Sequence, residues 1–219
     1  MACRTNRKHS EQCALMNRQL ILIGGGGHCR SCIDVIEQTD SYTIAGILDQ
    51  PTKIGQKVLG YPILAGDDAI TELASKHSFL VTIGHIHKVK PRIKASEAIL
   101  AAHGALATII SPHAYVSSHA KIGAGTIIMH GATVNAGARI GNNCIINSHA
   151  LIEHDAIIND HCHISTGAII NGGVQIGTQT FVGSKTMAKE YITIGAESFI
   201  AAGLNIYHDL PSQSREKPL

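Results

Sequence analysis

The stretch IGNNCIINSHALIEHDAII, residues 140–158, carries an isoleucine at every sixth position: Ile140, Ile146, Ile152 and Ile158. Neither an α-helix nor an alternating β-strand predicts a period of six. A triangular solenoid does, because each of its sides is one short β segment with one inward side chain. We therefore expect this stretch to be part of a left-handed parallel β-helix.

The same period extends well beyond this stretch. Sixteen of the seventeen positions reached in steps of six from Ile110 to Ile206 are Ile or Val, and the remaining one, Ala188, is small and apolar. β-Branched side chains are stiff and fill a pleated surface well. The β-helix is predicted over residues 109–207, followed by a C-terminal tail, 208–219. Glycines often follow the inward position, where we expect sharp turns; they are Gly123, Gly141, Gly177, Gly183 and Gly195.

Composition excludes several classes of protein. The formal net charge of the 219 residues is only +2 and the charges are dispersed, which argues against nucleic-acid binding. No apolar run reaches the roughly 18 residues of a membrane helix. Residues 1–18 contain Arg4, Arg7 and Lys8 but no apolar core, so we interpret them as a disordered leader, with Met16 as an alternative start. A cytoplasmic protein with reduced thiols is expected.

Residues 19–108 show the pattern of a small α/β domain. A strand at 19–23 is followed by four glycines, a helix, and a second strand, 42–48, that ends in an acidic residue. This is the order of a nucleotide-binding βαβ unit, in which glycines let the backbone approach a phosphate. A helix at 67–75, a strand at 79–83 and a helix at 89–102 complete a Rossmann-like parallel sheet. The ligand is expected beside Gly24, Gly25, Gly26, Gly27, His28, Asp49 and Gly84.

The glycine motif is incomplete, because Cys29 stands where a third fingerprint glycine would be. A tight turn without a ligand is the alternative. Cys29 and Cys32 form a C-x-x-C pair inside the expected helix, and with no second such pair we interpret them as incidental.

A candidate catalytic group lies in the β-helix. Ile152 is an inward position, so His154 is outward and available as a general base, and Asp155 can orient its ring. Gly172 lies one 18-residue coil later, where its N–H could face a developing oxyanion. The other solenoid histidines are expected on the surface. An exposed histidine beside an exposed carboxylate is the alternative.

The glycine-loop domain, the hexapeptide coils, Ile152-Glu153-His154-Asp155 and His161-Cys162-His163 together resemble the sugar acetyltransferases of the bacillosamine, perosamine and sialic acid type. The resemblance covers roughly residues 19–210. It implies acetyl-CoA-dependent N-acetylation of a nucleotide-linked amino sugar in a homotrimer, without a metal.

The resemblance also implies individual roles. His154 is the base and Asp155 its partner, while His163 contacts acetyl-CoA and Gly172 donates to the thioester carbonyl. The glycine loop and Asp49 would bind the nucleotide sugar. Two departures stand out: Gly84 is followed by His85-Ile86-His87, and the tail reads Leu210-Pro211-Ser212. They leave open which sugar is the substrate and how the far end of the coenzyme is bound.

Three alternatives remain. One is O-acetylation of a sialic-acid-type sugar. Another is a zinc carbonic anhydrase on the same solenoid, with His113, His149 and His154 as ligands; Val116 stands where such an enzyme carries its catalytic glutamate. The third is a non-catalytic solenoid that binds sugars or assembles.

Overall fold

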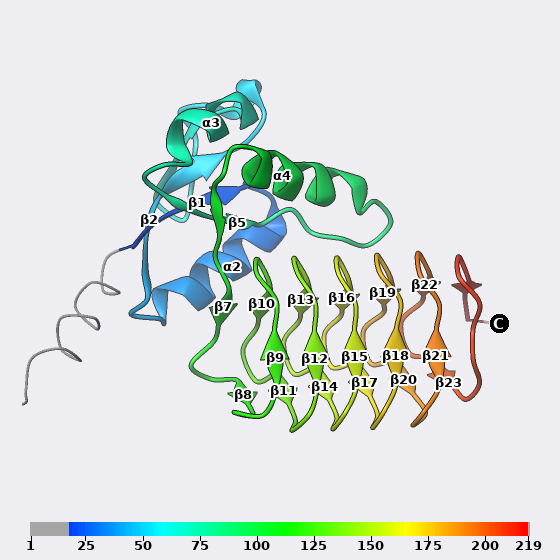
Figure 1. Ribbon diagram of the computed structural model, residues 1–219. Coiled ribbons are helices and arrows are strands. Elements are labelled where there is room, and N and C mark those ends of the chain that lie inside the picture. Colours follow the sequence, from blue (N-terminus) through cyan, green and yellow to red (C-terminus); the bar gives the residue numbers. More distant parts are fainter. Residues whose placement is uncertain (1–17, 219) are drawn as a thin grey trace, which may run out of the picture.

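The computed structural model describes residues 18–218, in which an α/β domain stands on one face of a long β-helix (Figure 1). The expected leader falls almost wholly in residues 1–17, outside the described part, and Arg18 already begins the first strand. No helix in residues 18–218 is long and apolar enough to span a membrane.

The α/β domain contains six strands in the order β3-β4-β2-β1-β5-β6. The strands are β1 (Arg18–Ile23), β2 (Tyr42–Leu48), β3 (Lys57–Val58), β4 (Tyr61–Ala65), β5 (Ser78–Val81) and β6 (Ala105–Leu106). The helices are α2 (Gly27–Glu37), α3 (Ile70–Leu73) and α4 (Lys90–Ala101). A 3₁₀ turn, Asp67–Ala69, takes the first part of the helix expected at 67–75.

The sheet is mixed rather than parallel throughout, because β3 and β4 pair antiparallel. The two residues between them, Leu59 and Gly60, both have positive φ, 48° and 91°. A two-residue turn of this kind matches the twist of a hairpin. Leucine is not a usual residue there, so the sequence does not reveal the hairpin.

The β-helix confirms the predicted repeat. Its strands form three parallel sheets, and partners such as Ile127 and Ile145 are eighteen residues apart. The first sheet contains β7 (Ile109–Ile110), β10 (Ile127–Ile128), β13 (Ile145–Ile146), β16 (His163–Ile164), β19 (Phe181–Val182), β22 (Phe199–Ile200) and β24 (Arg215–Glu216). The second contains β8 (Tyr115–Val116), β11 (Thr133–Val134), β14 (Leu151–Ile152), β17 (Ile169–Ile170), β20 (Met187–Ala188) and β23 (Asn205–Ile206). The third contains β9 (Lys121–Ile122), β12 (Arg139–Ile140), β15 (Ile157–Ile158), β18 (Gln175–Ile176) and β21 (Thr193–Ile194).

The repeat positions form one continuous apolar core, which runs from Ile128 to Ile206 and includes Ala188. Ile110, the first position in the series, is instead 40% exposed, because no coil precedes it. The core is narrow, so each coil contributes few side chains and depends on its neighbours for burial.

The turns at the corners of the β-helix do not lie at the glycines where the sequence predicts them. Fourteen residues at a strict spacing of six, from Gly125 to Gly203, have positive φ, and eight of them are not glycine. The glycines that follow inward positions have another role. A Cβ on Gly123 would lie 2.5 Å from the backbone of Gly141, and one on Gly177 would lie 2.3 Å from that of Ala196. These glycines let successive coils approach closely, and the turn itself lies two residues later.

The segment expected to be a tail continues the solenoid. β24 pairs with β22, and Leu210 bridges to Ile194. Both pairings join residues sixteen apart instead of eighteen. The last coil is thus two residues shorter, which takes it out of the six-residue series.

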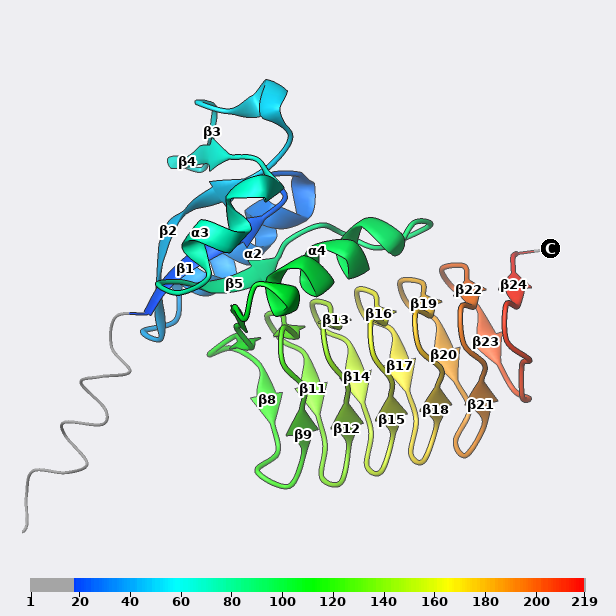
Figure 2. The same cartoon turned by 45° about the horizontal axis from the view of Figure 1, so that its top comes forward.

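The α/β domain packs on the first sheet of the β-helix (Figures 1 and 2). One apolar cluster joins Leu20, Leu22 and Ile33 of the domain to Ile109 and Ile127 of the coils. The edge between the second and third sheets lies on the opposite side of the solenoid (Figure 2).

A buried guanidinium also ties the two parts together. Arg92 of α4 is 1% exposed, and its Nε donates to the carbonyl of Asn143 at a coil corner, over 3.1 Å. Its Nη1 donates to the carbonyls of Val81 and Ile83. Burial lowers the pKa of Arg92 to about 10, so it stays charged at neutral pH. The three carbonyls offset part of the cost of removing this cation from water.

Three histidines around Arg92 are held neutral. Burial lowers the pKa of His28 and His85 to about 3, and the positive charge of Arg92 adds to the effect. Burial also lowers the pKa of His163 to about 4, although donation from its ring to the His85 carbonyl opposes the shift. The interface therefore contains uncharged imidazoles at physiological pH.

The core register can be tested with Ile152, which is fully buried. Ile152→Ala should lower the free energy of unfolding by ~2–5 kcal/mol, because it leaves a cavity in a core that cannot collapse. Lys121→Ala, at an exposed outward position, should change it little. Equal effects of the two substitutions in urea denaturation would contradict the register.

The neutral histidines predict a pH dependence of stability. Their folded pKa values lie below the unfolded value of ~6.5, so below that pH the unfolded chain binds protons that the folded chain does not. Stability should therefore be fully present above pH ~6.5 and fall toward pH 5, by up to ~1.4 kcal/mol per pH unit for each histidine. Urea denaturation at pH 7, 6 and 5 measures this slope, and His163→Gln should reduce it. A flat profile would show that these imidazoles are not buried as neutral groups.

Candidate active site

The four glycines that follow β1, the last of which is the first residue of α2, divide into two pairs. Gly24 has φ +99°, and a Cβ there would lie 2.6 Å from Ile83 Cγ1, while one on Gly25 would lie 3.0 Å from Asp49 Oδ2. The first pair is therefore required by the turn and its packing. A Cβ on Gly26 or Gly27 would meet nothing within 4 Å. The second pair leaves open space at the start of α2, which no side chain caps, so this helix terminus is suited to an anion.

Asp49, at the end of β2, shapes this loop. Its Oδ2 accepts hydrogen bonds from the Gly25 N–H over 2.8 Å and from Lys53 Nζ over 2.9 Å, and its Oδ1 accepts one from the Gln50 N–H over 2.7 Å. Burial raises the pKa of this carboxyl, but the hydrogen bonds outweigh burial and the net pKa is lowered. Asp49 is thus an ionised carboxylate, and the hydrogen bonds that its oxygens accept hold the glycine loop in place.

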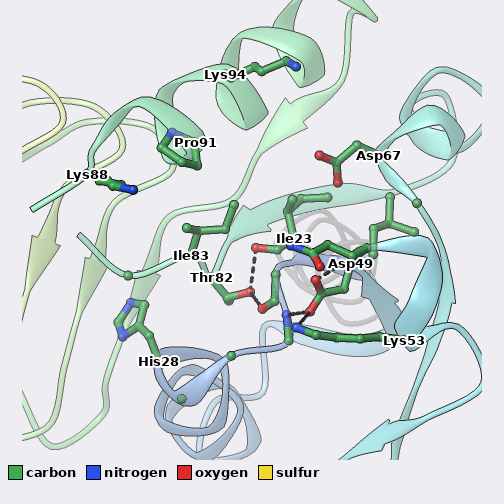
Figure 3. Close-up of a pocket in the computed structure, with 18 of the residues that line it drawn as sticks. Ile23, His28, Asp49, Lys53, Asp67, Thr82, Ile83, Lys88, Pro91 and Lys94 are labelled. Atoms are coloured by element: carbon green, nitrogen blue, oxygen red, sulfur yellow. Dashed lines mark hydrogen bonds and ion pairs between the residues drawn. The ribbon is translucent and has the colours of Figure 1, made fainter. Parts of the chain in front are cut away.

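These residues line a cavity of about 1030 Å³ at the carboxyl ends of the strands (Figure 3). All seven residues expected to bind the substrate lie on its wall, from Gly24 to Gly84.

His28 is neutral, and its Nε2 lies 3.4 Å from the Cys32 thiol. Cys29 and Cys32 are buried free thiols in α2, and burial raises the pKa of both. The C-x-x-C pair is therefore part of the domain core.

Sequence reasoning missed several groups on the cavity wall. Thr82 follows β5 directly, and its hydroxyl donates to the carbonyl of Gly24 over 2.7 Å. The position of Thr82 directly after a strand is the sequence feature that could have identified it as a residue of the cavity wall. The charged residues lie on loops and on α4, where no local pattern marks them. They are Lys53, Asp67, Asp68, Lys88 and Lys94.

The second candidate group lies on the β-helix. His154 and Asp155 occupy the turn between β14 and β15, and His154 Nδ1 donates to Asp155 Oδ2 over 3.0 Å. Asp155 is one of the corner residues, with φ 58°. Aspartate tolerates this left-handed conformation better than most residues. The carboxylate fixes the ring so that Nε2 remains as the acceptor.

Gly172 lies one coil further, directly beside the free face of His154. A Cβ on Gly172 would lie 2.6 Å from His154 Nε2. Within residues 18–218 the Gly172 N–H has no hydrogen-bond partner, whereas its carbonyl accepts from the Tyr191 N–H. The structure therefore brings together the expected base, its orienting partner and a free backbone donor.

The two groups are not brought together in one chain. Residues that line the cavity beside the glycine loop all come from the α/β domain. The turn between β14 and β15 instead lies at the edge of the solenoid away from that domain (Figure 2).

His163, the predicted coenzyme contact, lies in β16 of the first sheet. This residue is 6% exposed, beneath the loop that follows β5. Its Nδ1 donates to the His85 carbonyl, and its Nε2 lies 3.1 Å from Asn147 Nδ2, so both ring nitrogens are used within the chain. The docking of the α/β domain covers a residue that the repeat pattern alone places on the surface. The role predicted for His163 as a coenzyme contact stays a prediction.

The three histidines of the zinc alternative are also separated. His113 and His149 lie at corners between the first and second sheets, and His154 lies between the second and third. Among residues 18–218 no three His, Cys, Asp or Glu side chains are grouped to hold a metal ion.

Two family models match the sequence. The PglD N-terminal domain matches residues 19–95, and the bacterial transferase hexapeptide (six repeats) matches residues 119–154. A search of curated proteins gave no match.

Solved structures match over most of the chain. A variant of perosamine N-acetyltransferase from Caulobacter crescentus, in complex with CoA and GDP-perosamine, is 30% identical with a TM-score of 0.83, covering 89% of this chain and 90% of that chain. The acetyltransferase domain of PglB from Neisseria gonorrhoeae, in complex with acetyl coenzyme A, is 28% identical with a TM-score of 0.86, covering 93% and 100%. On this identity and coverage, the chain belongs to the family of sugar acetyltransferases that join a PglD N-terminal domain to hexapeptide repeats.

Proposed function

We propose that the protein transfers the acetyl group of acetyl-CoA to the amino group of a nucleotide-linked amino sugar, such as a 4-amino-4,6-dideoxyhexose. The observation that carries the proposal is the alignment of His154, Asp155 and Gly172 on consecutive coils. The open glycine cavity supports a nucleotide-linked acceptor, and the relatives solved with GDP-perosamine and with acetyl coenzyme A support the two substrates.

His154 is the general base in this proposal. The sugar nitrogen forms a bond to the acetyl carbon, the carbon–sulfur bond breaks, and His154 Nε2 takes the proton that the nitrogen loses. The same ring can then return the proton to the departing thiolate. Asp155 keeps Nδ1 protonated, so that Nε2 is the accepting atom. General-base assistance of this kind contributes ~10²–10⁴-fold to the rate.

Gly172 supplies the second part of the chemistry. Its unpaired N–H lies beside the base, where it can donate to the carbonyl oxygen of the thioester as that oxygen gains negative charge. A larger residue would displace the His154 ring, so the close contact between the coils requires glycine at this position.

We infer that the working site is shared between subunits of a homotrimer. The glycine cavity and His154 lie on different sides of one chain, so a neighbouring chain must bring its own His154 toward the bound sugar. A closed ring of three subunits repeats this heterologous contact three times.

The nucleotide cavity can be tested at Gly26, which has room for a side chain and an ordinary φ of −80°. Gly26→Leu should fill the cavity without straining the loop and weaken binding of GDP- or UDP-linked amino sugars by ~10-fold or more, as overpacking costs ~1–3 kcal/mol. Gly26→Ala should have a smaller effect, and affinity for CoA should be unchanged in both. Titration calorimetry showing equal affinities for Gly26→Leu and the wild type would place the nucleotide elsewhere.

The catalytic assignment can be tested at His154. His154→Ala should lower kcat by ~10²-fold or more with little change in the affinity for either substrate, because proton removal matters mainly in the transition state. Asp155→Asn should lower kcat less, and asparagine tolerates the left-handed conformation at this corner. Steady-state kinetics with titration calorimetry separates the two effects.

His149→Asn is the matched control for Asp155→Asn. Like Asp155, His149 occupies a corner in the left-handed conformation, with φ 57°. It should keep near-normal turnover. Loss of activity in this control, or wild-type turnover in His154→Ala, would contradict the assignment.

A further inference from the structure

Asn171 and Gly172 form the one Asn-Gly pair in the sequence, and they follow β17 at the corner that carries His154. Asparagine is a labile residue, and it loses its side-chain amide most readily before glycine, because no Cβ on glycine shields the backbone nitrogen from the asparagine carbonyl carbon. The left-handed residue of this turn is Gly173, with φ 68°, so Gly172 is not required by the turn. Asn171 is half-buried, and water can reach it.

The backbone nitrogen of Gly172 is free to react. Within residues 18–218 its N–H donates to no acceptor. Both neighbours are bonded, since the Asn171 N–H donates to the Ala188 carbonyl over 3.3 Å and the Gly173 N–H donates to the His154 carbonyl over 3.0 Å. A nitrogen in a backbone hydrogen bond must first give up that bond, whereas the Gly172 nitrogen has none to lose.

A base lies next to this nitrogen. A Cβ on Gly172 would lie 2.6 Å from His154 Nε2, the ring nitrogen that Asp155 leaves as the acceptor. A weak nucleophile is activated when an adjacent general base takes its proton. The placement of His154 therefore also suits removal of the proton from the Gly172 nitrogen.

The side chain of Asn171 is held along the backbone. Its Nδ2 donates over 2.9 Å to the Ala188 carbonyl, the same oxygen that accepts from its own backbone N–H. The amide thus stays close to the corner instead of extending into solvent. This keeps its carbonyl carbon near the peptide bond to Gly172.

Asn159 offers a comparison within the same chain. Its Nδ2 also donates over 2.9 Å to a carbonyl seventeen residues later, that of Ile176. The next residue is Asp160, whose side chain shields its backbone nitrogen. The two asparagines share the side-chain hydrogen bond, and the glycine with its neighbouring base distinguishes Asn171.

We propose that Asn171 is a site of self-modification, at which His154 promotes loss of the side-chain amide. The Gly172 nitrogen forms a bond to Asn171 Cγ, and the Cγ–Nδ2 bond breaks. His154 Nε2 carries the proton from the glycine nitrogen to the ammonia that leaves. Water then opens the resulting succinimide to aspartate or isoaspartate.

The modification removes the backbone donor beside the base. The succinimide nitrogen carries no hydrogen, and isoaspartate adds a methylene group to the backbone, which shifts the Gly172 N–H away from His154. The protein therefore loses activity with time. Only this consequence rests on the proposed acetyl transfer, since the modification itself needs neither substrate.

The test is the mass of peptides from the purified protein, incubated without substrates at mildly alkaline pH. Conversion of amide to acid is expected at Asn171, with isoaspartate among the products, while Asn159 stays an amide. His154→Ala should slow this conversion by ~10-fold or more, because it removes the base.

The loss of activity is followed in parallel, as acetyl transfer to a GDP-linked amino sugar. Asn171→Gln must form a larger ring and Asn171→Ser has no amide, so both should start with near-normal turnover and keep it. Asn159→Gln is the matched control and should lose activity as the wild type does.

An Asn171 that stays an amide while the wild type loses activity would overturn the proposal. So would equal rates of conversion in His154→Ala and the wild type, which would show that the imidazole takes no part. Conversion at Asn171 that requires His154, in a protein that acetylates no amino sugar, would support the modification site and refute the proposed function alone.

Discussion

The return of the chain to the same corner after eighteen residues is the constraint on which the rest of the structure depends. Each strand must pair with the strand one coil away, so in all coils before the shorter last one a residue lies beside the residue eighteen positions later. That rule places Gly172 against the ring of His154. It also holds the corners in the left-handed conformation, which at Asp155 brings the carboxylate back onto the neighbouring histidine. The geometry of the proposed catalytic group is thus a consequence of the coil.

The contact between the two parts of the chain adds a second level of organisation. Arg92 joins α4 and the end of β5 to the corner at Asn143, and His163 joins the following loop to the coils. These bonds fix the loop of residues 84–91, which forms part of the wall of the cavity beside the glycine loop. A displacement of this loop would therefore alter the shape of that cavity.

Much of this organisation could be predicted from sequence, because it depends on local spacing. The period of six identified the coils, and the step of eighteen from His154 identified Gly172. The order of strand, glycines and acidic residue identified the residues that line the cavity beside the glycine loop. Other features depend on contacts that spacing does not encode. His163 is an outward position that the docked domain covers. The strand β24 belongs to a last coil that is two residues shorter, so the six-residue spacing does not predict it. The lysines of the cavity beside the glycine loop come from segments of the α/β domain that have no repeat.

The central claim is that the glycine cavity and His154 act together across a subunit boundary. Subunit mixing tests it most directly, by refolding or exchanging two impaired variants into common oligomers. His154→Ala keeps an intact cavity, and Gly26→Leu keeps an intact base. With the acceptor kept well below its wild-type KM, we expect each variant alone to transfer acetyl groups slowly and the mixture to regain a substantial part of the acetyl transfer, because one subunit's cavity meets its neighbour's His154. A mixture no more active than its components, with mixed oligomers shown to form, would contradict the shared site.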